Sequence, residues 1–152
     1  MNAASIFDGL VSFFKAGQWP YTQVGEQPIL QIGFRGDNGE WLCYADARAE
    51  YAQVLFYSIC PTKTPVDRRI TVAEFITRAN FGMMIGNFEL DFEDGEVRYK
   101  TSLAVEGFEL NDEVIKSIVF SNVAVMDRYL PFLTQVINGQ LSPRDAIAKA
   151  EG

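Results

Sequence analysis

Residues 88–103, FELDFEDGEVRYKTSL, alternate apolar and polar side chains on both sides of the pair Asp94–Gly95. This alternation is typical of strands with one buried face, and Asp-Gly is a preferred two-residue hairpin turn. Such a turn pairs apolar residues with each other and opposite charges with each other: Phe92 with Val97, Leu90 with Tyr99, Asp91 with Arg98, and Glu89 with Lys100. Because both registers depend on the same turn, the stretch predicts an antiparallel hairpin.

A second hairpin is predicted upstream, where Leu30, Ile32 and Phe34 alternate with other residues and the chain turns at 36–39. The loop length decides which residues of the returning strand, 41–47, share the face of Phe34. A two-residue turn at Asn38–Gly39 places Trp41, Cys43 and Ala45 there. A three-residue loop places Leu42 and Tyr44 there instead, and the sequence leaves both alternatives open.

A third strand is predicted over residues 52–60, after a two-residue turn at Ala49–Glu50. This turn sets Cys43 opposite Phe56 and leaves Cys43 and Cys60 roughly 13 Å apart along the sheet, too far for a disulfide. We therefore expect both cysteines to be free and buried.

Helices are predicted on both sides of these strands. Asn2 or Ser5 caps a first helix that ends at Gly17, and the capping box Thr71–Glu74 opens a second that ends near Gly82. Asn111 caps the longest, which runs to Ile137, is apolar on most faces and contains Pro131, where we expect a kink or restart. Ser142–Pro143 opens a short last helix.

These elements follow the order α-βββ-α-ββ-αα. The order predicts an α+β fold, an antiparallel sheet with helices packed on it, in a single domain over residues 1–152.

The composition argues against most catalytic chemistry. The chain has no His, which excludes Ser-His-Asp and Cys-His catalysis and His-ligated zinc, and it has no phosphate-binding glycine motif. Asp91, Glu93, Asp94 and Glu96 resemble the start of a calcium loop, but they alternate with strand residues and the loop's closing glutamate is missing. We expect no enzymatic activity, no metal and no cofactor.

The net charge is −7, and residues 89–113 alone carry nine acids against two bases. Such an acidic face repels phosphate backbones, so we expect no nucleic acid as partner. No apolar run approaches a membrane span and the N-terminus lacks the pattern of a signal peptide, so we expect a cytoplasmic protein with no membrane partner.

Two motifs mix polar and apolar residues at predicted helix ends: residues 78–82, RANFG, and residues 126–131, MDRYLP. Either they pack the helix ends on the sheet or they form a partner surface, since Arg and aromatic residues are favoured at interfaces.

The stretches 77–82, 85–91, 94–101 and 127–131 together resemble the YbjN family of bacterial proteins. The resemblance runs from about Val72 to Ile147. It implies a fold like that of type III secretion chaperones, which are small, acidic, cytosolic homodimers that hold a partner segment in extended form. The family is described as sensory-transduction regulators, and it supplies no catalytic residues.

We therefore expect a non-enzymatic protein-binding module, chaperone-like or regulatory, that acts as a homodimer and holds a segment of an unidentified client protein. The alternative is a regulator that binds a small ligand in a pocket between sheet and helices. The dimer or partner interface is expected on the long helix and at the end of the second helix, at Phe120, Val123, Asp127, Arg128, Leu130, Arg78 and Phe81.

Overall fold

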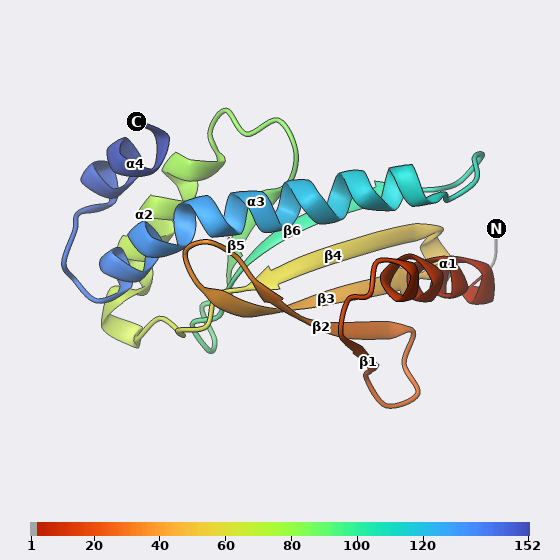
Figure 1. Ribbon diagram of the computed structural model, residues 1–152. Coiled ribbons are helices and arrows are strands. Elements are labelled where there is room, and N and C mark those ends of the chain that lie inside the picture. Colours follow the sequence, from red (N-terminus) through yellow and green to blue (C-terminus); the bar gives the residue numbers. More distant parts are fainter. Residues whose placement is uncertain (1–2) are drawn as a thin grey trace.

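The computed structural model describes residues 3–152, which form a six-stranded antiparallel sheet in the order β1-β2-β3-β4-β6-β5 (Figure 1). The strands are β1 (Tyr21–Gln23), β2 (Ile29–Arg35), β3 (Glu40–Arg48), β4 (Gln53–Ile59), β5 (Asn87–Leu90) and β6 (Val97–Ala104). The helices are α1 (Ala3–Ala16), α2 (Arg69–Asn80), α3 (Asp112–Ile137) and α4 (Pro143–Glu151), with short 3₁₀ turns η1 (Ala49–Tyr51) and η2 (Val66–Arg68).

One face of this sheet is covered by helices. The helix α1 packs on β3, α3 packs on β4 and β6, and α2 packs on β5 with α4 beside it (Figure 1). We call this the covered face; the opposite face, which carries Leu42, Tyr44 and Ile59, is the open face. The expected α+β architecture is confirmed.

The element order is α-ββββ-α-ββ-αα, so the predicted order lacked one strand. The additional strand is β1, whose Tyr21 pairs with Ile32 of β2. Three residues are too few to show an alternating pattern in the sequence. The strand β1 is defined by its pairing with the edge of β2.

The helix starts were predicted with mixed success. Asn111 and Ser142 cap their helices, each side chain accepting a backbone N–H. Ser5 lies inside α1 rather than at its cap, and Asn2 lies outside the described residues. The prediction for Thr71 was wrong, because α2 begins two residues earlier at Arg69, as a continuation of η2.

The three predicted hairpins all have connections longer than a two-residue turn, and each register differs by two residues from that of a two-residue turn. Phe34 pairs with Trp41 across a four-residue loop, Cys43 pairs with Ser58 rather than Phe56, and Leu90 pairs with Val97 rather than Tyr99. A shift of two residues leaves every side chain on the same face. For the β2–β3 hairpin the sequence left the face open, and the structure places Trp41, Cys43 and Ala45 on the face of Phe34. For the β3–β4 and β5–β6 hairpins the predicted registers were wrong.

The register shift also changes the ion pairs of the β5–β6 hairpin. Glu89 lies opposite Arg98 and bonds both Arg98 and Lys100, at 2.8 and 3.1 Å. Partial burial would raise the pKa of Glu89, but the hydrogen bonds from Lys100 and Arg98 outweigh it and lower that pKa. The predicted pair of Asp91 with Arg98 is not formed, since Asp91 instead accepts the N–H of Glu93 in the six-residue loop.

A buried polar network joins α3 to the covered face. The Asn122 amide donates to the carbonyls of Phe56 and Tyr99 at 2.9 and 3.1 Å, and its oxygen accepts the Ser58 hydroxyl at 2.6 Å. Ser58 in turn accepts the indole N–H of Trp41 at 2.9 Å. Because every polar group in the network has a partner, the network fixes how α3 sits on the sheet.

Candidate functional site

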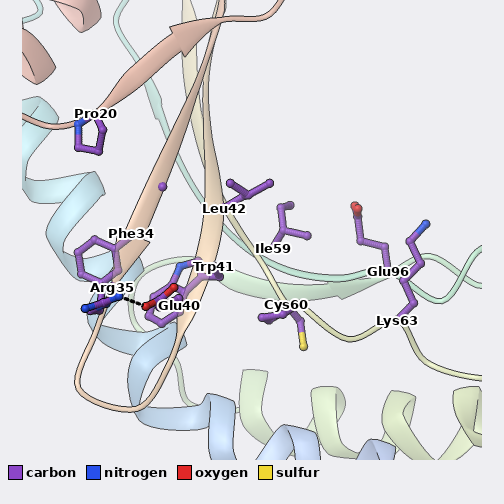
Figure 2. A pocket seen from close by; sticks show the side chains of 12 residues that line it. Pro20, Phe34, Arg35, Glu40, Trp41, Leu42, Ile59, Cys60, Lys63 and Glu96 are labelled. Carbon is purple, nitrogen blue, oxygen red and sulfur yellow. Dashed lines mark ion pairs between the residues drawn. The ribbon is translucent and has the colours of Figure 1, made fainter.

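A groove of about 720 Å³ lies at the ends of β2, β3 and β4, where the sheet is not covered by a helix (Figure 2). Its wall takes in both faces of the strand ends and is mostly apolar. The lining residues are Pro20, Gly33, Phe34, Arg35, Glu40, Trp41, Leu42, Ile59, Cys60, Pro61, Lys63 and Glu96.

The apolar wall is built from neighbouring strands. Leu42 of β3 pairs with Ile59 of β4 on the open face, and its side chain is 44% exposed. At one end, Phe34 packs against Trp41 with ring centroids 5.1 Å apart and stacks on Trp19 at 5.7 Å. The result is a firm apolar surface that faces solvent, which is typical of sites that bind a ligand or a protein segment.

The charged side chains at the rim of the groove are mostly paired within the chain. Arg35 forms an ion pair with Glu40, and Lys63 bonds Asp94 at 3.1 Å (Figure 2 draws the first pair). The backbone N–H of Glu96 and then the Lys63 ammonium lower the pKa of Asp94. Because these rim charges already have partners, the apolar residues of the groove, such as Leu42 and Ile59, are the surface that a ligand covers at least cost.

Two smaller hollows extend from the groove on the same side of the sheet. One of about 360 Å³ lies between β3 and β4 around Tyr44 and Tyr57, and one of about 330 Å³ lies beside the β5–β6 hairpin. Ile59 lines the groove and the first of these, while Glu96 lines all three. The three hollows are therefore neighbours that share Glu96 in their walls.

The end of the groove is held in place by α3. The Asp127 carboxylate accepts the N–H groups of Asp37 and Asn38 in the β2–β3 loop, at 3.2 and 2.8 Å. The Asn38 amide donates to the Asp127 carbonyl at 3.1 Å. Pro131 lacks the N–H that would occupy this carbonyl in a regular helix, so the loop takes the vacant acceptor and α3 continues to Ile137 without restarting.

Two glycines allow this close approach. A Cβ on Gly36 would lie 2.2 Å from an Asp127 oxygen, and one on Gly39 would lie 2.8 Å from a methyl carbon of Leu130. The loop thus sits directly on α3, and this contact positions the strand ends that carry Arg35, Glu40 and Trp41.

Cys60 is a groove residue with no sign of reactivity. Burial raises the pKa of its thiol to about 11, and burial raises that of Cys43 on the covered face to the same value. Both thiols are free and buried. A neutral thiol is a poor nucleophile, so Cys60 is not an activated cysteine.

The residues predicted as an interface fall into three groups. Val123 and Leu130 are buried between α3 and the rest of the chain, so the strip of leftover apolar surface expected on this helix is smaller than predicted. Asp127 holds the β2–β3 loop, and Arg128 donates to the Ala150 carbonyl at 2.7 Å. These contacts explain the MDRYLP motif as an anchor of the fold.

The remaining predicted interface residues lie at the surface. Phe120 is 45% exposed beside Trp19, Phe81 is 90% exposed, and Arg78 is paired with Glu74. Asn80, between Arg78 and Phe81 in the sequence, bonds the backbone N–H and the carbonyl of Phe88. These two groups on the outer edge of β5 therefore have partners. Phe81 and Phe120 are therefore the predicted residues that still offer apolar surface to a partner.

The groove itself was not predicted from the sequence. The sequence left the face of Leu42 open, because that face depends on the length of the loop between residues 35 and 40. In the structure Leu42 pairs with Ile59 on the open face, and two large aliphatic residues at these positions were the available signal. Among residues 3–152, no group of three metal-ligating side chains forms. In the same described range, no helix is long and apolar enough to span a membrane.

Solved structures define the class of fold. One chain of the ExsC–ExsE complex aligns with a TM-score of 0.62 at 13% identity, over 88% of this chain and 97% of that one. The HopA1–SchA chaperone–effector complex aligns over 92% and 97% with a TM-score of 0.48, also at 13% identity. The first of these alignments shows that the protein has an α+β fold like that of type III secretion chaperones.

The family follows from the sequence model described as "Putative bacterial sensory transduction regulator", YbjN, which matches residues 7–135. The chain belongs to the YbjN family. The crystal structure of YbjN from E. coli, titled "a putative transcription regulator", covers 78% of this chain and 91% of its own with a TM-score of 0.54 and 13% identity. Among curated protein sequences, none matches this chain.

Proposed function

We propose that this protein is a non-enzymatic binding module that holds an extended segment of a partner protein in the groove. The observation that carries the proposal is the apolar wall of the groove around Leu42 and Ile59, which faces solvent at the strand ends. The fold supports it, since a structure with the same fold was solved as a complex of two proteins. We expect the protein to act in the cytoplasm.

The decisive variant is Leu42→Asp, which places a charge in the apolar floor without touching the core. Ser102→Asp is the control, because it adds the same charge at an exposed residue of the same face that lines none of the hollows. Wild type and Ser102→Asp should retain a stoichiometric partner from the source cell, and Leu42→Asp should lose it. The partner, once identified and purified, should protect the amides at the ends of β3 and β4 from hydrogen exchange. Equal retention by all three proteins would reject the groove as the binding site.

We further propose that the module is a homodimer. Apolar surface outside the groove supports this, namely Phe120 on α3 and Phe81 and Met84 in the loop between α2 and β5. Light scattering should give a mass near twice 17.1 kDa. Phe81→Asp or Phe120→Asp should halve it, with Glu93→Ala as the control. A wild-type mass near 17.1 kDa would reject the dimer.

A second candidate function is the binding of a small apolar ligand in the same groove. A volume of about 720 Å³ lies within the usual range of small-molecule sites, roughly 300 to 1,000 Å³. The groove opens at the strand ends, rather than between sheet and helices as predicted. A ligand-induced rise in melting temperature that Leu42→Asp abolishes, with no protein partner retained, would favour this candidate.

A further inference from the structure

Glu96 lines the groove and both of the smaller hollows beside it. It directly precedes β6, and its backbone is fixed on both sides: its N–H donates to Asp94 at 2.9 Å, and its carbonyl accepts the N–H of Asp91 at 2.9 Å. The Glu96 side chain therefore contacts a ligand that fills the groove or either of the smaller hollows.

The other charged side chains that line these hollows already have partners. The ion pairs are Arg35 with Glu40, Lys63 with Asp94, Arg48 with Asp46, and Arg98 with Glu89. Asp91 accepts the backbone N–H of Glu93. Lys63 lies beside Glu96 in Figure 2, but its ammonium bonds Asp94.

Among the described residues, the carboxylate of Glu96 has no hydrogen bond or ion pair, although the side chain is partly buried. Ile59 and Pro61 line the same groove. A lysine or arginine suits such a place, because its aliphatic stem covers apolar surface while its charged head reaches a carboxylate. The net charge of −7 attracts a cationic segment over a longer range.

We propose that the segment bound in the groove carries a lysine or arginine that pairs with Glu96, flanked by apolar residues that cover Leu42 and Ile59. This inference rests on the proposed function and adds the chemistry of the partner. It predicts a selective binder of basic, apolar segments rather than a general holder of unfolded chain, because an acidic or neutral segment leaves Glu96 unpaired as it becomes covered.

The test uses a phage-displayed library of random twelve-residue peptides selected on the wild-type protein and counter-selected on Leu42→Asp. Peptides that depend on Leu42 should be enriched in Lys or Arg next to aliphatic or aromatic residues. For a synthesised winner, Glu96→Gln should weaken binding by about tenfold in fluorescence anisotropy. Glu93→Gln is the matched control, since it removes the same charge from an exposed residue outside the hollows and should change binding less than about twofold.

The reciprocal change is made in the peptide, so that the result does not depend on the variant alone. Replacing its basic residue by norleucine should weaken binding to wild type about tenfold and leave binding to Glu96→Gln unchanged. Peptides that need Leu42 but lack a basic residue, or equal effects of Glu96→Gln and Glu93→Gln, would overturn the pairing and leave the proposed function standing. If no selected peptide depends on Leu42, the proposed function fails and this inference fails with it.

Discussion

The two faces of the sheet use the same alternation of side chains for opposite purposes. On the covered face, Phe56, Tyr99 and Thr101 are buried, and the polar groups among them bond Asn122. On the open face, Leu42 and Ile59 keep contact with solvent beside paired charges. The apolar side chains of the covered face are buried when the chain folds. The open face keeps apolar side chains exposed to solvent, and a bound partner could bury them.

The largest difference between the faces should appear in stability. Phe88 is buried and its ring packs on Tyr99 at 4.9 Å and Tyr129 at 5.6 Å, so Phe88→Ala should cost about 3–5 kcal/mol. Leu42→Ala should cost under about 1 kcal/mol. Urea unfolding of both variants measures the contrast. Similar costs would mean that the open face is covered in solution.

The polar network of the covered face should come next. Asn122→Ala leaves the Ser58 hydroxyl and two strand carbonyls short of a partner, which should cost about 2–4 kcal/mol in the same unfolding experiment. Ser121→Ala is the control, since the Ser121 hydroxyl bonds only its own helix. A cost as small as that of the control would show that water replaces the amide.

The two buried thiols predict a loss of stability in alkali. Burial raises the pKa of Cys43 and Cys60 from 9.0 to about 11, so the folded state favours the neutral thiol. Their contribution, roughly 1–3 kcal/mol for each, is fully present below pH 9.0 and disappears as the pH rises towards 11.

Unfolding measured across that range should show a steeper loss for the wild type than for a variant with both cysteines replaced by Ala. The comparison separates the thiols from tyrosines that ionise nearby, such as Tyr129, whose pKa burial raises to about 12. Thiol reagents should react slowly with the folded protein at neutral pH. Rapid reaction of either thiol would contradict the covered position.

A smaller effect is expected where α3 holds the groove. Asp127→Ala removes the two carboxylate acceptors of the β2–β3 loop, while the backbone carbonyl that bonds Asn38 remains, and should cost about 1–2 kcal/mol. Amide exchange at Asp37 and Asn38 should speed up in this variant, and partner binding should weaken. Asp127→Asn keeps an acceptor and should retain part of the protection. Unchanged exchange in Asp127→Ala would mean that the loop holds its shape alone.

The smallest effect is expected on the open face. Glu89 is about one-third exposed, so Glu89→Ala should cost under about 1 kcal/mol despite two ion pairs. Because the pKa of Glu89 is lowered, this contribution is present at neutral pH and disappears as the pH falls through the lowered value. Unfolding at neutral and acidic pH checks both points. A cost above that of Asp127→Ala would mean that the ion pairs of the open face stabilise the protein more than the contact between α3 and the β2–β3 loop.

Side-chain alternation predicted the strands, but it could not decide the face of β3 relative to β2 or the register of any hairpin. Each of the three predicted hairpins lies two residues from the register of a two-residue turn, and in two of them the loop bonds a distant segment of the chain. The Asp127 carboxylate accepts backbone N–H groups of the β2–β3 loop, and the backbone N–H of Thr64 donates to the carbonyl of Gly95 in the β5–β6 loop. Contacts between segments far apart in the chain are invisible to a local pattern.

The sequence by itself determined the α+β class, the helix caps at Asn111 and Ser142, and the alternation of buried and exposed residues along the strands, because these depend on periodicity and on bonds within a few residues. The tertiary structure alone decided the pairing of β1, the burial of Val123 and Leu130, and the groove beside Glu96. These features depend on which surfaces the folded chain covers, and that follows from packing across the whole domain.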